Sequence, residues 1–369
     1  MKIGINASFA RKPGSGMGEV TLNYLRALGD KNKNDEFVLY LEEDLILDLP
    51  KNFTKKVFLP SYKRDDLVRK IIWEKFLLPK RIKEDGCESL ISLYQCPTIL
   101  SEEINHTMVV HDIIPELFPE YVNNWRKKYY WSLTKKAIKK ASRIVAVSQN
   151  TKDDLIKYFK IEENKIVVKY IDVDAIYKKE VTDFDSQAVL KKYELTPGYI
   201  YSGGGLDKRK NIDTLIYAYK LLLDKNKNIP DLVISGKLMP QLAPLIIDVE
   251  KIVKELEIQD KVKILGFVSQ ENLPAIYKNA SVFVYPSLYE GFGLPLLEAM
   301  NVGVPIVTSS NSSLDEVIGD SAVFFDPNNK EDVANKIEEI LNNKELREGN
   351  IIKAREQARN FSWEKFIEF

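Results

Sequence analysis

Short apolar segments rich in β-branched residues alternate with amphipathic helical patterns along almost the whole chain, in two successive series. This alternation is typical of parallel sheets that are covered by helices on both faces. With 369 residues, the chain also exceeds the size at which a single core keeps growing. We therefore predict two doubly wound α/β units, each of the Rossmann-like kind, which face one another across a cleft.

The first series predicts five strands, and three helices between them. The strands are expected at Lys2–Ala7, Glu36–Leu41, Ser89–Leu93, Thr107–His111 and Arg143–Val147, and the helices at Glu19–Leu28, Lys63–Lys83 and Trp125–Ala141.

A region that reads as a linker, residues 175–197, separates this series from the second one. The second series predicts strands at Tyr199–Ser202, Asp231–Ser235, Val262–Leu265, Val282–Tyr285 and Pro305–Thr308, and helices at Ile212–Leu223, Leu245–Leu256 and Lys330–Leu341. The last stretch, Glu345–Phe369, is helical by its charge spacing. We accordingly place an N-terminal domain at 1–175, a C-terminal domain at 176–350, and at 351–369 a helix that packs back on the N-terminal domain.

The charges of the chain sum to zero but are unevenly distributed. Residues 1–174 hold 30 Lys and Arg against 25 Asp and Glu, whereas the remainder holds 24 against 29. The two cysteines, Cys87 and Cys96, are too few for a disulfide framework and fit a reducing compartment. We expect neither an export signal nor a membrane-spanning helix, and thus a cytoplasmic protein.

The most informative segment runs from Val282 to Pro305, where an apolar strand breaks at Pro286. A turn containing Glu290, Gly291 and Gly293 then leads to Pro295, a residue favoured in the first turn of a helix. Unpaired N–H groups at a helix N-terminus suit an anion or a group of hydroxyls. The turn is therefore a candidate ligand loop, formed by Glu290, Gly291, Phe292, Gly293 and Leu294, with Glu298 one helical turn further. The alternative is a capped helix whose Glu298 is merely solvated or ion-paired.

A second candidate loop follows the first predicted strand of the second series. Three glycines, Gly203, Gly204 and Gly205, precede the basic pair Arg209 and Lys210. Glycines let a backbone approach a phosphate closely, while a guanidinium and an ammonium supply donors and positive charge. This combination suits a diphosphate, although a simple strand–helix turn with solvated basic residues has the same composition.

A glycine-rich segment also follows the first strand of the chain. Gly14, Gly16 and Gly18 do not fit the Gly-x-Gly-x-x-Gly fingerprint, because Glu19 stands where its third glycine is needed. A nicotinamide-dependent dehydrogenase is thus disfavoured. The loop can still face a phosphate or an acceptor, and the alternative is a long surface turn.

His111 and Asp112 close the fourth predicted strand, at the sheet edge where open parallel sheets bind ligands. The histidine is therefore a candidate site residue, although histidines in such positions are often structural. His106, just before this strand, is given no role.

Two stretches of the N-terminal half are strongly basic and contain interleaved aromatic residues. Residues 121–152 hold nine Lys and Arg and no acid, and residues 51–83 hold eleven against three acids. Such segments suit an anionic membrane surface or a lipid-pyrophosphate acceptor, and a solvated helix face explains them equally well. Nucleic-acid binding is disfavoured, because no binding motif accompanies the charge.

Taken in order, these motifs resemble family 4 of the retaining GT-B glycosyltransferases, also called glycosyl transferases group 1. The segment from Glu290 to Glu298 is similar to the Glu-x7-Glu signature of that family, and Gly203 to Asn211 is similar to its phosphate-binding variant. Many members carry an arginine where this chain has Gly205, so the sequence leaves open whether Arg209 replaces it or points away. The resemblance extends over nearly the whole chain and includes Gly266, Phe267 and Val268.

The resemblance implies metal-independent transfer of a hexose from a nucleotide-diphosphate sugar, without further cofactor, to a glycan or lipid-linked acceptor in surface polysaccharide or glycoconjugate synthesis. It favours a hexose of the mannose or rhamnose type and GDP-mannose as the donor, with UDP sugars next. Arg209 and Lys210 would stabilise the departing diphosphate. Glu290 would hold the donor sugar, Glu298 the ribose, and His111 the acceptor or donor sugar. The remaining alternatives are a nucleotide-sugar epimerase or hydrolase and a non-catalytic nucleotide-sugar-binding subunit.

Overall fold

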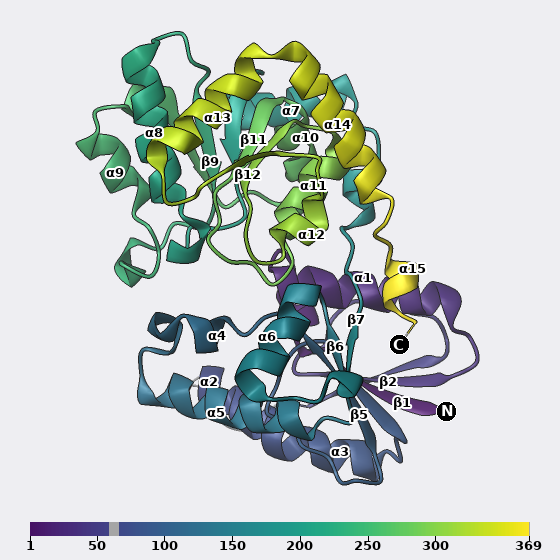
Figure 1. Cartoon of the computed structure of the whole chain (residues 1–369). Helices are drawn as coiled ribbons and strands as arrows, with labels where there is room; N and C mark the ends of the chain where they lie inside the picture. Colours follow the sequence, from purple (N-terminus) through teal and green to yellow (C-terminus); the bar gives the residue numbers. More distant parts are fainter. Residues whose placement is uncertain (59–65, 369) are drawn as a thin grey trace. The chain divides into compact units, whose positions relative to one another are not determined.

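The structure is a computed structural model, and it describes residues 1–58 and 66–368. Contacts between Cα atoms divide the chain into two compact units, which are described separately. Unit 1 consists of Met1–Asp172 and Phe361–Phe369, and unit 2 consists of Val173–Asn360. Both chain termini thus belong to unit 1 (Figure 1). The expected domain limits at 175 and 350 remain predictions.

Unit 1 is built on a seven-stranded sheet in the order β3-β2-β1-β4-β5-β6-β7, and every pairing is parallel. The order reverses between β1 and β4, as in other doubly wound folds. The strands are β1 (Lys2–Asn6), β2 (Glu36–Leu41), β3 (Phe53–Val57), β4 (Ser89–Ser92), β5 (Asn105–Val110), β6 (Arg143–Ala146) and β7 (Ile166–Val168).

Helices lie on both faces of this sheet, with α1 opposite α2, α3 and α5 (Figure 1). The short C-terminal helix α15 contacts α1, where Phe366 packs edge-on against Tyr24. The helices are α1 (Gly16–Lys31), α2 (Asp66–Ile72), α3 (Leu78–Glu84), α4 (Ile114–Leu117), α5 (Trp125–Lys140), α6 (Gln149–Phe159) and α15 (Trp363–Phe366), with short 3₁₀ turns η1 (Ser8–Arg11), η3 (Pro119–Val122) and η4 (Glu163–Lys165).

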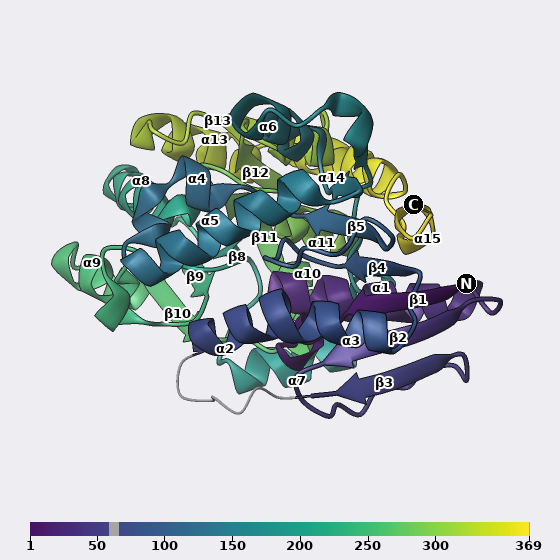
Figure 2. The same cartoon turned by 90° about the horizontal axis from the view of Figure 1, so that it is seen from below.

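The helix expected over residues 63–83 is one continuous rod in its described part, but it contains a π-helical turn, Trp73–Leu77, between α2 and α3 (Figure 2). Residues 63–65 of the expected helix lie outside the described residues. A π-helical turn has hydrogen bonds between residues i and i+5 and is rare. Its residues Trp73 and Glu74 are buried.

Unit 2 is a six-stranded parallel sheet in the order β10-β9-β8-β11-β12-β13, with its reversal between β8 and β11. The strands are β8 (Tyr199–Ser202), β9 (Leu232–Ser235), β10 (Val262–Gly266), β11 (Ala280–Tyr285), β12 (Ile306–Ser309) and β13 (Val323–Phe325).

Two groups of helices enclose this sheet (Figure 1). An aliphatic core lies between the sheet and α8, α9 and α13, while an aromatic cluster around Tyr201, Tyr277 and Phe283 fills the opposite face. The helices are α7 (Asp183–Lys192), α8 (Ile212–Lys225), α9 (Val249–Glu255), α10 (Leu273–Lys278), α11 (Leu294–Val302), α12 (Leu314–Ile318), α13 (Lys330–Asn342) and α14 (Lys344–Ala358), with 3₁₀ turns η5 (Ala175–Lys178), η6 (Lys208–Lys210), η7 (Pro240–Leu242), η8 (Gln259–Lys261) and η9 (Gln270–Asn272).

Several expectations about secondary structure were wrong. The single helix expected at 351–369 is interrupted, because α14 ends at Ala358 and α15 begins at Trp363, where Ser362 caps it. The supposed linker at 175–197 contains η5 and helix α7, which begins with a capping box: Thr182 and Asp185 exchange hydrogen bonds between side chain and backbone. The strands β3, β7 and β13 were missed because β3 is largely exposed, while β7 and β13 have only three residues each, which is too short for a recognisable pattern. The helix expected to begin at Leu245 begins at Val249, where Asp248 caps it.

Candidate functional site

The candidate site of unit 2 lies where the strand order reverses, beyond the carboxyl ends of β8 and β11. The loop Gly203–Gly205 leaves β8, and the turn from Pro286 to Gly293 leaves β11 and enters α11. In open parallel sheets this position is where ligands bind. Two motifs that are about 80 residues apart in the sequence are therefore brought together, because β8 and β11 are neighbouring strands.

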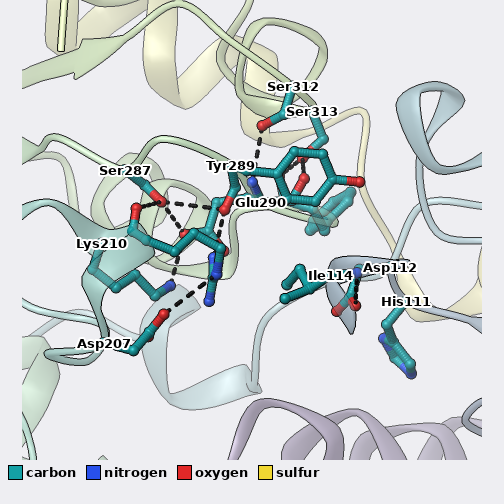
Figure 3. A network of polar contacts seen from close by, with 12 residues as sticks. His111, Asp112, Ile114, Asp207, Lys210, Ser287, Tyr289, Glu290, Ser312 and Ser313 are labelled. Atoms are coloured by element: carbon teal, nitrogen blue, oxygen red, sulfur yellow. Dashed lines mark hydrogen bonds and ion pairs between the residues drawn. The ribbon is translucent and has the colours of Figure 1, made fainter. Parts of the chain in front are cut away.

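Glu290 is the centre of a buried polar cluster in this site (Figure 3). Its Oε1 atom accepts hydrogen bonds from Lys210 Nζ at 2.7 Å, Tyr285 Oη at 2.8 Å and Ser287 Oγ at 2.5 Å. Its Oε2 atom forms an ion pair with Arg209 Nη1 at 2.8 Å. The carboxylate thus links both basic residues of the first loop to the second loop.

The two positive charges beside Glu290 determine the protonation state of its carboxyl group. Burial by itself raises the pKa of Glu290, but the positive charges of Lys210 and Arg209 outweigh it and lower the pKa from 4.5 to about 2. Burial lowers the pKa of Lys210, which the charge of Glu290 opposes. The carboxylate is therefore ionised at neutral pH and suited to hold the two cations in place.

Arg209 points into this cluster. Its Nη1 atom also donates to the carbonyl oxygen of Tyr289, and its Nε atom lies 3.4 Å from Asp207 Oδ1. Burial by itself lowers the pKa of Arg209, but the charges of Glu290 and Asp207 together outweigh it, so the pKa is raised. The guanidinium is thus fixed by both loops, which answers the question of its direction that the sequence left open.

The turn that carries Glu290 is held by two serines from the loop after β12. Glu290 N donates to Ser312 Oγ at 2.9 Å, while Ser313 Oγ donates to the carbonyl oxygens of Glu290 and Phe292 at 2.9 and 2.8 Å (Figure 3). Ser312 has a φ of 51°, an uncommon value for a residue other than glycine. No sequence pattern points to these serines or to the roles of Tyr285 and Ser287.

The other predicted residues of unit 2 lie around this cluster or at the sheet edge. Gly293 caps α11 with a φ of 113°, and Leu294 begins the helix. Glu298 is half-buried, and its Oε2 atom accepts a hydrogen bond from Tyr277 Oη at 2.9 Å. Phe267 and Val268 follow the edge strand β10, two strands away from β8, with Phe267 62% exposed and Val268 buried.

In unit 1, His111 and Asp112 directly follow β5. The Nε2 atom of His111 is 2.9 Å from the carbonyl oxygen of Leu93, so Nε2 carries the proton. Burial lowers the pKa of His111, and Leu93 and Asp112 oppose this shift. The imidazole is therefore neutral and has its Nδ1 atom as an acceptor. Asp112 Oδ1 accepts from Ile114 N at 2.9 Å and so shapes the turn (Figure 3).

The glycine-rich loop of unit 1 differs in one respect from its expected form, because α1 begins at Gly16 rather than at Glu19. Ser15 caps the helix, and Glu19 reaches back to Gly14 N at 2.7 Å. Gly14 has a φ of 80°, and a Cβ atom at Gly18 would lie 2.0 Å from the carbonyl oxygen of Lys12. Two of the three glycines are therefore required by the backbone, whatever the loop binds.

Comparisons with known proteins identify the family. Residues 15–174 match the model described as Glycosyltransferase Family 4, and residues 185–357 match Glycosyl transferases group 1. O-antigen chain mannosyltransferase B of Escherichia coli is 35% identical over 255 residues, which cover 69% of this chain and 66% of that protein. The chain belongs to family 4 of the glycosyltransferases.

A second relative agrees with this assignment, and solved structures show the fold. The serotype-specific mannosyltransferase WbdA of Escherichia coli is 31% identical over 69% of this chain and 31% of its own length. The chain's matches thus span between about a third and two thirds of these relatives. The glycosyltransferase WaaG has a TM-score of 0.77 at 16% identity, and Anabaena Alr3699/HepE, solved with UDP and glucose, has 0.74 at 16%. These likenesses, over 100% of this chain and 97–98% of those chains, show the two-domain GT-B fold.

In this family 4 chain, Gly204 allows the first loop to pack against helix α11. It has a φ of 98°, and a Cβ atom there would lie 2.8 Å from Pro295 Cγ and 3.2 Å from Tyr285 Cε2. We expect Gly204→Val to destabilise unit 2 by about 1–3 kcal/mol, because a β-branched residue is strained at this φ and displaces Pro295. Urea unfolding measures this loss.

Gly349→Ala is the matched control for this prediction. Gly349 lies inside α14, and a Cβ atom there would meet nothing within 4 Å. The control is expected to gain roughly 0.5–1 kcal/mol, since alanine is a better helix former than glycine. If Gly204→Val were as stable as the unchanged protein, the close packing of loop and helix would be refuted.

Proposed function

We propose that this protein transfers a hexose from a nucleotide-diphosphate sugar to a glycan or lipid-linked acceptor in surface polysaccharide synthesis. The observation that carries the proposal is the buried cluster of Arg209, Lys210 and Glu290 between a glycine loop and the start of a helix. Such a site offers cations and backbone N–H groups to the negative charge that develops on a departing diphosphate.

The roles of individual residues belong to this proposal. Arg209, Lys210 and the backbone from Gly291 to Leu294 bind the diphosphate, with Gly204 permitting its close approach. Oε1 of Glu290 already accepts three hydrogen bonds, whereas Oε2 is paired only with Arg209 among the residues that the structure describes. Oε2 is thus the atom that can accept from a donor-sugar hydroxyl. Glu298 holds the ribose, and Phe267 and Val268 border the nucleotide.

In unit 1, the neutral His111 accepts a hydrogen bond from a sugar hydroxyl through Nδ1. Asp112 and the loop of Gly14, Gly16 and Gly18 position the acceptor or the phosphate. The reaction proceeds with retention and without a metal: the leaving phosphate takes the proton of the attacking hydroxyl, so the protein needs no nucleophile of its own. GDP-mannose is the favoured donor and mannose the transferred sugar, because two similar proteins from Escherichia coli are mannosyltransferases.

The experiment combines the protein with GDP-mannose, UDP-glucose and other nucleotide sugars, each with a panel of glycan acceptors. Proton NMR of the product gives the anomeric configuration, and an excess of EDTA tests for a metal requirement. Retained configuration and EDTA-resistant turnover are expected. Epimerisation or hydrolysis of the donor without transfer would favour a nucleotide-sugar epimerase or hydrolase, and binding without turnover would favour a non-catalytic subunit.

The N-terminal unit also has the features of a surface that binds an anionic membrane, the second partner in this proposal. At the start of α5, the side chains of Trp125 and Tyr129 are 73% and 48% exposed. Phe76 is 58% exposed and lies in the π-helical turn that follows α2, a helix in contact with α5. Basic residues such as Arg126 and Lys136 accompany them. Aromatic rings beside basic side chains suit the interface of an anionic bilayer. No helix of the described residues is long and apolar enough to cross a membrane.

Replacing Trp125 and Tyr129 together by serine tests this surface. We expect at least a fivefold loss of cosedimentation with vesicles that contain phosphatidylglycerol, and no binding of either protein to purely phosphatidylcholine vesicles. The control is Phe184→Ser, because Phe184 is 80% exposed and belongs to unit 2, not to the unit that carries this surface. Equal binding of the double variant and the unchanged protein would refute the membrane surface.

A further inference from the structure

Unit 1 contains a cavity of about 200 Å³ that none of the individually predicted site residues lines, although half of its lining comes from the basic, aromatic stretch 121–152. Its lining includes the aromatic residues Tyr94, Tyr121, Tyr130 and Trp131 and the amines of Lys70 and Lys127. Tyr94 follows β4, which borders the reversal of strand order in this sheet. The cavity thus has the location at which an open parallel sheet binds ligands.

A buried carboxylate holds two of these rings from behind. Glu74, which is fully buried in the π-helical turn, accepts hydrogen bonds from Tyr94 Oη at 2.6 Å and from Tyr130 Oη at 2.8 Å. Burial raises the pKa of Glu74, and the charge of Lys70 opposes this shift. Both tyrosine hydroxyls are thereby committed to Glu74, which fixes the orientation of the rings.

Lys70 is held in the same network. Its Nζ atom lies 3.6 Å from Glu74 Oε1, and it is 4.6, 4.9 and 5.3 Å from the ring centres of Phe9, Tyr94 and Tyr130. An ammonium surrounded by ring faces and one carboxylate is strongly positioned. Glu74 thus faces the amine of Lys70 from behind the cavity, and Lys127 adds a second amine to the lining.

The cavity is also connected to the end of β5. Gln95 belongs to its lining, and its side chain accepts from His111 N at 3.2 Å and donates to the carbonyl oxygen of Asp112 at 3.3 Å. A ligand in the cavity would therefore lie next to the segment that carries the proposed sugar-binding histidine.

We propose that this cavity binds a sugar ring at the accepting end of the glycan, with the network around Glu74 and Lys70 positioning its aromatic wall. The inference rests on the proposed function, because a transferase needs a second site for its acceptor. Aromatic faces match the C–H faces of a sugar ring, and the amines and the Gln95 amide can bind its hydroxyls. An alkyl chain fits less well, since it would remove the Lys127 amine from water without replacing its hydrogen bonds.

Two variants test the assignment without disturbing the buried network. Lys127→Met removes an amine from the lining, and Val122→Trp fills the cavity from the short turn η3. We expect each to raise the acceptor KM at least tenfold, while the affinity for nucleoside diphosphate, measured by calorimetry, stays within twofold. The matched control is Lys157→Met on α6, an exposed lysine outside the lining, for which the acceptor KM should not change.

Direct binding is measured by saturation-transfer NMR with a panel of methyl hexosides and deoxyhexosides, and with octyl phosphate as the probe for an alkyl chain. Binding of a glycoside that Val122→Trp abolishes supports the proposal. Octyl phosphate binding without glycoside binding, or no binding by any probe, overturns it. The outcome is separable from the proposed function, because failure of the latter appears as absent nucleotide-sugar turnover and absent nucleoside diphosphate binding in the unchanged protein.

Discussion

Lys210→Met is expected to lower kcat/KM for glycosyl transfer by roughly 10²–10³, the usual effect of removing one group that stabilises charge in a transition state. Lys210 is buried, and its ammonium is held by Glu290 and by Tyr285 Oη, each at 2.7 Å. Because its position is fixed before the substrate arrives, little reorganisation is needed when the diphosphate departs. Methionine keeps the length and the apolar part of the side chain, so the loss reports on the charge.

The control for this variant is Lys208→Met. Lys208 stands two residues earlier in the same short turn, η6, but it is exposed. It should keep at least half of the activity, since an exposed ammonium is screened by water. A folded Lys210→Met protein that retained more than a tenth of the activity would contradict the assigned role of Lys210.

Glu290→Ala is expected to cost about 3–5 kcal/mol of unfolding free energy in addition to activity, because it leaves the charges of Lys210 and Arg209 buried without their carboxylate. That is a large fraction of the roughly 5–15 kcal/mol that stabilises a typical domain. From sequence alone, the alanine variant would be expected to keep its fold, since Glu290 reads as an open loop residue. Its burial makes Glu290→Gln, which keeps an acceptor oxygen, the better variant for kinetic work.

A double variant and an acid titration test the same prediction. Lys210→Met combined with Glu290→Ala should be more stable than the sum of the single effects predicts, by about 1–3 kcal/mol, because one buried cation goes with the carboxylate. The pKa of Glu290 is lowered to about 2, so its stabilising contribution is complete above pH 4.5 and is lost as the pH falls from 4.5 toward 2. Glu290→Gln should therefore lose less stability over this range than the unchanged protein. Additive effects and parallel acid profiles would disprove the coupling.

Much of the fold was predictable, because the relevant signals are local. Buried strands such as Glu36–Leu41 and Tyr199–Ser202 were predicted with their observed limits, since their short length and their aromatic and β-branched residues distinguish them from buried helices. Among the missed elements, β3 is largely exposed, β7 and β13 have only three residues each, and α7 begins with polar residues that also occur in loops. Periodicity carries no information where the side chains are mostly exposed.

The sequence by itself determined the two alternating series, the glycine loops, the Glu290–Glu298 segment and, through its resemblance to known proteins, the family. Only the tertiary structure decided that Arg209 and Lys210 share one buried carboxylate with the second loop, and that Glu74 holds two tyrosines behind a cavity. The reason is physical: such contacts join residues 20 to 80 positions apart, and they exist because parallel strands distant in the chain are neighbours in the sheet. Local spacing predicts which side chains share a loop or a helix turn, whereas strand order decides which loops lie side by side.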